Sequence, residues 1–384
     1  MGATITTLTG QAVEAEVRAL SPRRRVITAE ARRAQVDAWE LFEDAAGGNL
    51  RAKMLLAESL ATSDFPKVFG AALDAKLLSE YQAISPVWQQ FAARDTLPDF
   101  RPQSWVDLLG GQGALSLVGE GAPYPRRPLS EADGSYKVDK YGDTIGLTWE
   151  MFINDRLNAF RQLPNRLAVA AREMEDRIAT SMLTDGDGPN TALFSATAAK
   201  GALGAAGTTL LAGNPVLTED SLTAAILAIQ TRRDFDGRPV VLNGAVLVVP
   251  TALQTVAERI VGATEIRETV GSKLIIRTNP LAGRVKVCVN PWLQVLDANV
   301  LAPKSWYLLP EPSANGRPAI VLGFLAGHEV PDLRVKNDAG NRVGGGAIAP
   351  EEGSFEFDTI DYRVRHILGA GSVDANQVAY SAGT

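Results

Sequence analysis

Residues 107–150 read DLLGGQGALSLVGEGAPYPRRPLSEADGSYKVDKYGDTIGLTWE, and residues 151–184 continue as MFINDRLNAFRQLPNRLAVAAREMEDRIATSMLT. The first part is rich in Gly, Pro and charge, and short alternating pieces at 114–118 and 135–138 flank a Pro-Arg-Arg-Pro tip. This pattern predicts a long two-stranded ribbon. A two-stranded ribbon alone is only marginally stable in water, and loops of this length usually serve a function. We therefore expect the ribbon to lie on another molecule, most simply another subunit.

The second part of this stretch predicts helices, because its apolar residues recur at steps of three or four. These residues are Ile153, Leu157, Phe160, Leu167, Ala171, Met174, Ile178 and Met182. Pro164 falls between the two sets, and proline is tolerated in the first turn of a helix but disrupts its middle. The sequence therefore predicts a short helix at 149–160 and a long helix at about 163–184, which ends at the turn 185–189.

The rest of the chain interleaves helical and strand patterns without a regular repeat. Residues 1–60 are helical in character and are interpreted as an extended arm. Further helices are predicted at 65–85, 217–233 and 251–261, and strands at 245–249, 285–289, 305–309, 319–325 and 354–367. This order is typical of an α+β protein with a mostly antiparallel sheet.

Composition limits the class of protein. The chain has 384 residues, of which 46% are hydrophobic and 21% charged, so it can bury a sizeable core divided over two or three domains. Its net charge of -6 argues against a protein built to hold nucleic acid, and any DNA contact is expected to be weak and non-specific. No apolar run approaches the roughly 20 residues of a membrane span, and no secretory signal is recognisable. We expect no membrane association, and synthesis in the cytoplasm.

The motifs of enzymes and metal sites are largely missing. His328 and His366 have no partners at the spacing of a zinc site, and the glycines at 110–113 lack the remainder of a phosphate-binding loop. The Asp-Gly turn at 185–188 lacks the ligands of a calcium loop. Cys288, the single cysteine, lies in an alternating strand pattern and is interpreted as a small core residue. The sequence therefore predicts no catalytic residue, cofactor or metal.

Charged residues are placed where partners could use them. Arg126, Arg127, Lys137 and Lys140 lie on the ribbon, and Glu173, Glu175 and Asp176 lie on the predicted long helix, on the side interpreted as exposed. If the ribbon lies over a neighbour's helix, these opposite charges would set register and specificity. The alternative is that both sets are simply solvated, because exposed ion pairs contribute only about 0 to 1 kcal/mol each.

The order of these parts resembles the major capsid proteins of tailed bacteriophages, and more specifically the Mu-like major head subunit family. The matching pieces span most of residues 65–371. They are FPKVFGAALDAKLLSEYQ, LVGEGAPYP, YGDTIGLTWEMFINDRLNAFRQLPNRLAVAAREMEDRIATSMLTDGDG, LFS, GAVLVVPTALQTVAERIV, SWYLLPEP and FEFDTIDYRVRHILGAG. The first sixty residues match least.

The resemblance implies a Hong Kong 97 type fold with an N-terminal arm, an extended E-loop, a peripheral domain containing a long spine helix, and an axial domain. The implied divisions are a helical arm at 1–64, the start of the peripheral domain at 65–100, the E-loop at 101–147, the peripheral domain with its spine helix at 148–214, the axial domain at 215–330, a return to the peripheral domain at 331–371 and a C-terminal tail at 372–384. The seven charged residues named above would then be assembly residues on the E-loop and the spine helix.

The implied function is that of a major head protein, which self-assembles into pentamers and hexamers of an icosahedral shell around double-stranded DNA in the virion. Implied partners are a separate scaffolding protein, a portal and decoration proteins. Lys137 and Lys140 lie on the E-loop, but covalent crosslinking is not predicted. Two alternatives stay open, namely an encapsulin-like compartment shell with the same fold and an α+β enzyme with dispersed acidic catalytic residues.

Overall fold

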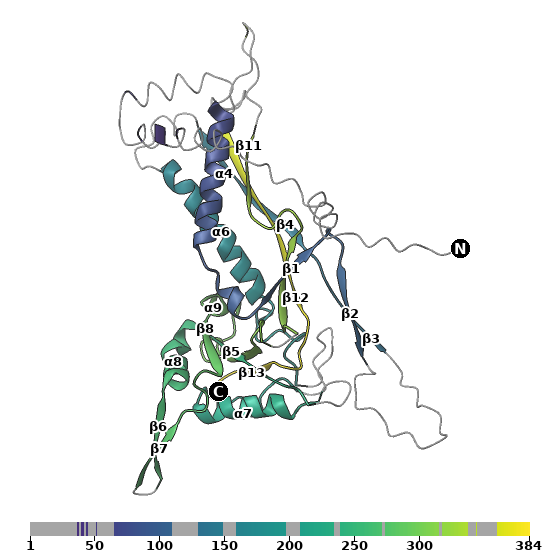
Figure 1. Cartoon of the computed structure of the whole chain (residues 1–384), viewed down its shortest axis with the longest axis vertical. Coiled ribbons are helices and arrows are strands. Elements are labelled where there is room, and N and C mark those ends of the chain that lie inside the picture. Colours follow the sequence, from purple (N-terminus) through teal and green to yellow (C-terminus); the bar gives the residue numbers. More distant parts are fainter. Residues whose placement is uncertain are drawn as a thin grey trace, which may run out of the picture. The chain divides into compact units, whose positions relative to one another are not determined.

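The computed structural model of the chain, drawn in Figure 1, describes most residues from position 65 onward. The described residues are 37, 40, 41, 44, 51, 65–109, 130–148, 159–196, 208–233, 239–270, 273–314, 317–336, 343 and 359–384. Most of the expected arm at 1–64, the ribbon tip and most of the expected short helix at 149–160 therefore lie outside the described residues.

The helices and strands follow one another in a mixed order. The helical elements, of which η1 and η2 are single 3-10 turns, are α4 (Phe65–Ala83), η1 (Val87–Gln90), α6 (Ala159–Thr180), α7 (Glu219–Thr231), η2 (Thr251–Leu253), α8 (Gln254–Gly262) and α9 (Trp292–Leu296). The strands are β1 (Ala93–Leu97), β2 (Gln103–Leu109), β3 (Ser130–Tyr136), β4 (Asp139–Thr148), β5 (Ala245–Val249), β6 (Glu265–Val270), β7 (Lys273–Thr278), β8 (Val285–Val289), β9 (Trp306–Pro310), β10 (Ile320–Leu325), β11 (Asp332–Val335), β12 (Thr359–Ser372) and β13 (Ala379–Ser381). The predicted α+β class is confirmed.

The chain divides into two compact units, which are described separately. The first contains the described residues of 1–80, 142–168 and 332–365, and the second those of 81–141, 169–331 and 366–384. The helices α4 and α6 and the strands β4 and β12 each run from one unit into the other.

In the first unit, β12 pairs antiparallel with β11, from Asp332↔Arg365 to Val335↔Tyr362. The strand β4 also pairs with β12. At Gly142 of β4, an added Cβ would lie 2.4 Å from the carbonyl oxygen of Val364, so only glycine fits this close approach of the two strands. The carboxylate of Asp332 contacts both Arg334 and Arg365, each at 2.8 Å, and fixes the end of the pair.

The second unit is built on a four-stranded sheet in the order β13-β9-β5-β8, in which only the pair β5–β8 is parallel. Every residue of β5 is buried, as its unbroken Ala-Val-Leu-Val-Val run predicts for a strand covered on both faces. On one face, Leu247 packs with residues of α7 and α8 such as Leu222 and Ala257. On the other face, Val248 packs with Trp88 and with the end of α6. Figure 1 shows α7 and α8 beside this sheet.

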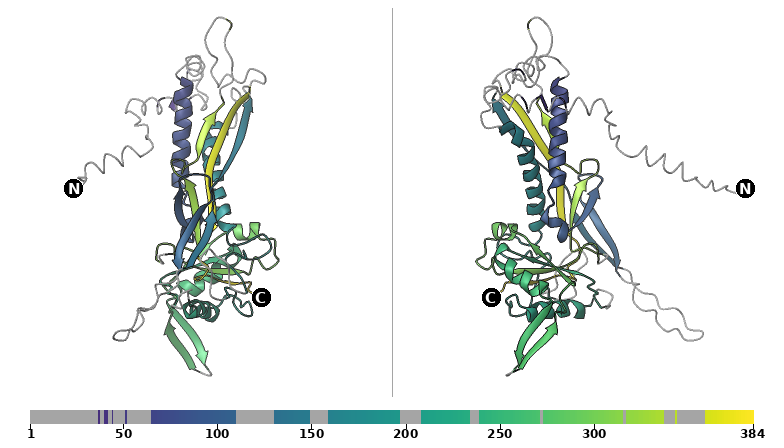
Figure 2. Two further views of the ribbon diagram at one scale, coloured as in Figure 1. Left: turned by 90° about the vertical axis from the view of Figure 1, so that its right-hand side faces the viewer. Right: turned by 60° about the vertical axis from the view of Figure 1, so that its left-hand side comes forward.

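A two-stranded ribbon leaves the second unit, as the sequence predicts. Its strands β2 and β3 pair antiparallel over seven residue pairs, from Gln103↔Tyr136 to Leu109↔Ser130, and lie side by side in both views of Figure 2. The returning strand β4 pairs with β12 instead, so the pairing within the ribbon ends at Tyr136. Beyond this point Lys137 lies so close to β12 that a Cβ at Gly369 would come within 2.0 Å of its carbonyl oxygen.

The expected long helix is present as α6, but it begins earlier than predicted. It runs from Ala159 to Thr180 with Pro164 inside it, so the expected break at the proline is wrong. Pro164 lacks the N–H that would bond to the carbonyl of Phe160, and it lies in the second turn of the described helix. The later turns bury Leu167, Ala168, Ala171 and Ala179, and this packing favours the helix despite the local cost. The C-terminal end is also earlier, because residues 181–183 form turns.

The sequence predicts neither the hairpin β6–β7 nor the strand β13. Residues 372–384, expected only as a C-terminal tail, are mostly buried, and β13 forms an edge of the four-stranded sheet. The interpretation of Cys288 as a core residue is confirmed, since it is buried and burial raises the pKa of its thiol to about 12. Among the helices of the described residues, none is long and apolar enough to cross a membrane.

Candidate functional site

The structure places the predicted assembly residues of the ribbon in different settings. Arg126 and Arg127 lie outside the described residues. Lys137 follows β3, is 58% exposed, and forms an ion pair with Asp139 at 3.0 Å. Lys140 is exposed on β4. The two described lysines are therefore accessible, and Lys137 already has a partner on its own chain.

On the long helix, only one of the three acidic residues has the predicted exposure. Glu173 is exposed, but Glu175 is fully buried and Asp176 is 8% exposed, so the expectation that all three lie on the solvent face is wrong. The physical reason is helical spacing. Glu175 follows the buried Ala171 by four residues and precedes the buried Ala179 by four, which places it on the core-facing stripe.

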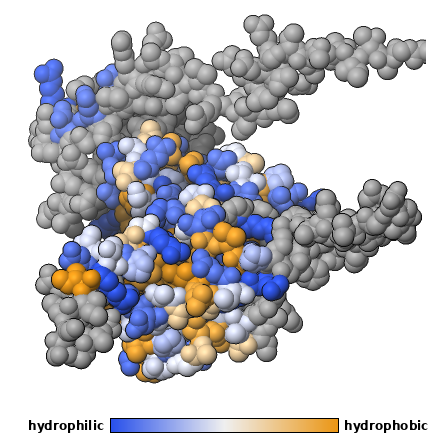
Figure 3. Space-filling model, turned by 60° about the horizontal axis from the view of Figure 1, so that its bottom comes forward, coloured by the Kyte–Doolittle hydropathy of each residue, from blue (hydrophilic) through white to orange (hydrophobic). Residues whose placement is uncertain are grey.

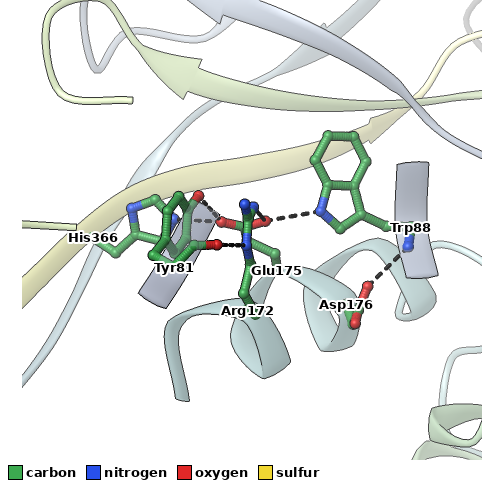
Figure 4. Close-up of polar contacts among 6 residues, drawn as sticks. All are labelled: Tyr81, Trp88, Arg172, Glu175, Asp176 and His366. Atoms are coloured by element: carbon green, nitrogen blue, oxygen red, sulfur yellow. Dashed lines mark hydrogen bonds and ion pairs between the residues drawn. The ribbon is translucent and has the colours of Figure 1, made fainter. Parts of the chain in front are cut away.

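Four side chains surround the buried carboxylate of Glu175 (Figure 4). Tyr81 of α4 donates its hydroxyl to Oε1, and Nε2 of His366 on β12 lies 2.9 Å from the same oxygen. The other oxygen, Oε2, accepts from Nε1 of Trp88 and from Nη1 of Arg172, both at 2.9 Å. The carboxylate thus joins the neighbouring elements α4 and η1 to α6 and β12, which lie far from them in the sequence.

Arg172 is bound in three ways within this cluster. Its Nη1 contacts Glu175, and its Nε donates to the carbonyl oxygen of Tyr81 at 2.9 Å. Its guanidinium carbon also lies 3.6 Å from the centre of the Tyr81 ring, which is the geometry of a cation–π contact. Tyr81 lies in the last turn of α4, where the helix dipole has its negative end. The positive charge of Arg172 at the Tyr81 carbonyl therefore interacts favourably with this dipole.

Asp176 holds the neighbouring turn η1. Its Oδ1 accepts the backbone N–H of Trp88 at 2.8 Å. Burial raises the pKa of Asp176 to about 6, the Trp88 N–H opposes this shift, and the adjacent charge of Glu175 adds to it. Burial also tends to raise the pKa of Glu175, but hydrogen bonds from His366 and Tyr81, together with the charge of Arg172, hold it below its usual range. Two consecutive carboxyl groups therefore have pKa values shifted in opposite directions.

A carboxylate, a histidine and a tyrosine in contact could support acid–base chemistry if a substrate could reach them. Here Tyr81, Glu175 and His366 are all at least 95% buried, and each bonds to a group of the same cluster. Within the described part of the chain, no group of His, Cys, Asp and Glu residues is arranged to hold a metal ion. Because these groups are buried and bonded to one another, the arrangement can fix four elements in place.

Comparison with known proteins gives structural likenesses at low sequence identity. The capsid of the cyanophage P-SCSP1u is 10% identical, with a TM-score of 0.48 over 77% of this chain and 87% of that one. A structure from Mycobacterium phage Patience is 13% identical, with a TM-score of 0.46 over 81% and 87%. The holo-SrpI encapsulin complex of Synechococcus elongatus PCC 7942 is 10% identical, with a TM-score of 0.43 over 79% and 90%.

No curated protein matches the chain. The model of a protein family described as phage capsid protein matches residues 131–380, which is about two thirds of the chain. The match extends from β3, through Arg172, Glu175 and Asp176 of α6, to β13, and Tyr81 and Trp88 lie before it. The expectation drawn from the order of ribbon, helix and returning strand is thus confirmed at the level of the family, and the chain belongs to the phage capsid protein family.

Proposed function

We propose that this chain is the major capsid subunit of a tailed phage, with a Hong Kong 97 type arrangement, and that it assembles into pentamers and hexamers of an icosahedral shell around double-stranded DNA. Membership of the phage capsid protein family supports a role in the shell. The ribbon β2–β3 carries the proposal further, because it extends from a well-packed unit and pairs with no third strand among the described residues.

In this proposal, the ribbon β2–β3 is the core of the E-loop and α6 is the spine helix. The four-stranded sheet with α7 and α8 forms most of the axial domain, and the paired strands β11 and β12 belong to the peripheral domain. The expected boundaries at 101–147 and 215–330 are kept, with the addition that β13 completes the sheet of the axial domain.

Projecting segments suit a shell subunit for a physical reason. Association costs translational and rotational freedom at each contact, so a stable shell needs many contacts per subunit. The face drawn in Figure 3 carries its apolar side chains in small groups among hydrophilic ones rather than in one continuous patch. A ribbon that reaches a neighbour adds contact area that such a face does not supply. Contacts between unlike patches then close into rings.

The acidic character of the chain fits a shell that does not hold its DNA tightly. With a net charge of -6 and a pI near 5.2, the chain as a whole has no excess of the positive charge that attracts phosphates. A separate scaffolding protein, a portal and decoration proteins are proposed partners, and assembly is proposed to take place in the host cytoplasm.

Electron microscopy of the purified full chain, at increasing protein concentration, tests the proposal. We expect rings, tubes or shells in negative stain, and nucleic acid inside particles isolated from infected cells. A chain that stays monomeric under all assembly conditions, with or without a scaffolding protein, would contradict the proposal. Particles from cells that enclose a protein cargo instead of DNA would favour an encapsulin-like compartment.

A further inference from the structure

The hairpin formed by β6 and β7 pairs with no third strand among the described residues. Six residue pairs, from Glu265↔Thr278 to Val270↔Lys273, join its two strands. Figures 1 and 2 show both strands extending away from α8 and β8 of the same unit. Because an isolated two-stranded hairpin is at best marginally stable in water, this hairpin needs a further contact along its length.

The base of the hairpin is firmly anchored. The buried side chain of Asn279 donates to the carbonyl oxygens of Ile260 and Ala263, both at 2.7 Å, at the end of α8. The backbone N–H of Asn279 donates to Thr264 at 3.0 Å, and Arg277 forms an ion pair with Glu219 of α7 at 3.3 Å. The direction of the hairpin is therefore set before any partner binds, which lowers the entropy cost of binding.

The composition of the hairpin indicates what kind of partner it fits. Its strands contain the aliphatic residues Ile266, Val270, Leu274, Ile275 and Ile276. Ile276 is 54% exposed, so its aliphatic side chain is available to a partner. The charged residues of the strands are Glu265, Arg267, Glu268, Lys273 and Arg277. Acidic and basic residues are nearly balanced, which argues for a protein partner and against the phosphates of packaged DNA.

We propose that the hairpin β6–β7 is an assembly arm that packs on a neighbouring copy of this chain. The inference rests on the proposed function, since copies of the same chain are the partners that surround every subunit of a shell. The contact joins the hairpin of one copy to a different surface of the next, as a closed ring of identical subunits requires. Among the described residues, β6 and β7 each have one edge that pairs with no strand, and such an edge allows backbone pairing with a neighbour.

The matched variants Ile276→Glu and Ile276→Val test the arm in the full chain. Ile276→Glu introduces a charge at the proposed contact, whereas Ile276→Val keeps a branched apolar side chain. We expect Ile276→Glu to raise the protein concentration needed for half-assembly by at least about tenfold, and Ile276→Val to change it little. Sedimentation velocity measures this concentration. Because Ile276 is half exposed, the dissociated chain of either variant should unfold at nearly the same urea concentration as the wild-type chain.

A photo-crosslinking amino acid at position 276 identifies what covers the hairpin. Normal and heavy-isotope chains are mixed while dissociated, assembled together and irradiated. Crosslinked peptides that combine a normal and a heavy chain support the arm. Crosslinks only within one chain would show that another segment of the same chain covers the hairpin. This result would overturn the proposal of an assembly arm. Normal assembly of Ile276→Glu would also overturn the arm while leaving the proposed function intact, whereas a wild-type chain that never assembles would overturn both.

Discussion

Glu175 shows how one buried carboxylate can hold several elements. Its side chain is fully buried and accepts from Tyr81, Trp88 and Arg172, with His366 also in contact. Replacing Glu175 by Ala would remove the carboxylate that pairs with Arg172 and would leave the donors of Tyr81 and Trp88 without their acceptor. We expect Glu175→Ala to lower the free energy of unfolding by about 3–5 kcal/mol, the range for breaking a buried ion pair.

The exposed neighbour Glu173 provides the matched control on the same helix. Glu173→Ala removes the same carboxylate from a solvent-facing position and is expected to change the free energy of unfolding by less than about 0.5 kcal/mol. Urea unfolding of the dissociated chain, followed by tryptophan fluorescence, compares the two variants. Equal effects of the two substitutions would show that Glu175 does not hold the cluster together.

Asp176 is expected to make stability depend on pH. Its pKa is about 6 in the folded chain, above the ordinary value of 3.8, so the folded state binds the proton more tightly than the unfolded state does. The contribution of Asp176 to the free energy of unfolding is therefore fully present below the ordinary value and is lost as pH rises toward 6. The total loss is about 3 kcal/mol, because each pKa unit is worth about 1.4 kcal/mol.

Asp176→Asn tests this prediction, because its amide oxygen can still accept the Trp88 N–H but carries no charge. We expect the variant to gain stability relative to the wild-type chain as pH rises from about 4 to about 7.5. Urea unfolding at several pH values measures this difference. A difference that stays constant over this range would contradict the assigned pKa. Asp176→Ala is the contrasting variant, since it leaves the Trp88 N–H without its acceptor and should be destabilising at every pH.

The residues of this cluster could not be identified from the sequence. The spacing of Ala171, Glu175 and Ala179 does contain a signal that Glu175 faces the core, and the interpretation of an exposed acidic face overlooked it. The partners of Glu175 cannot be predicted in this way, because Tyr81 and His366 are 94 and 191 positions away from it in the sequence. Local patterns do not reveal which distant side chain meets a buried charge.

At the scale of elements, the contact between the base of the ribbon and β12 depends on a glycine. A Cβ at Gly369 would lie 2.0 Å from the carbonyl oxygen of Lys137, a backbone atom that cannot easily move away. We expect Gly369→Ala to lower the free energy of unfolding by about 1–3 kcal/mol, because the backbone must shift to make room for the added methyl group. Gly262→Ala is the control, because a Cβ there meets nothing within 4 Å at the end of a helix. Thermal unfolding should separate the two, and equal melting temperatures would contradict the close contact.

The elements that the sequence predicts well are those with strong local patterns. The fully apolar strand β5 and the helix α7, with its Thr218–Ser221 capping box, both lie where the sequence predicts them. The sequence does not predict the hairpin β6–β7 or the strand β13. The strand β13 has only three residues, Ala379–Ser381, and it becomes a strand because β9 lies beside it. Short strands depend on their neighbours more than on their own residues.

At the scale of the whole molecule, the burial of two acidic residues changes the hypothesis of charge pairing between subunits. Glu175 and Asp176 have partners within their own chain, so Glu173 is the one exposed member of the predicted acidic set. A ribbon bearing Arg126 and Arg127 would therefore find less negative charge on a neighbour's α6 than the sequence suggests. Apolar and backbone contacts then become more important for assembly, since an exposed ion pair contributes at most about 1 kcal/mol.

The C-terminal segment is expected to be essential for folding. Its residues Ala375, Val378, Ala379, Tyr380 and Ala382 are buried in the core, and its backbone carbonyls at 376 and 378 accept from the guanidinium of Arg232. Deleting residues 374–384 would remove β13 and expose the edge of β9 in the four-stranded sheet. It would also leave the guanidinium of Arg232 without these two acceptors. We expect the truncated chain to be insoluble or to lose its cooperative thermal transition, because an exposed sheet edge promotes aggregation. A short polar extension after the exposed Thr384 is the control and should leave the transition unchanged. A truncated chain that stays soluble and melts like the full chain would show that the sheet does not need its last strand.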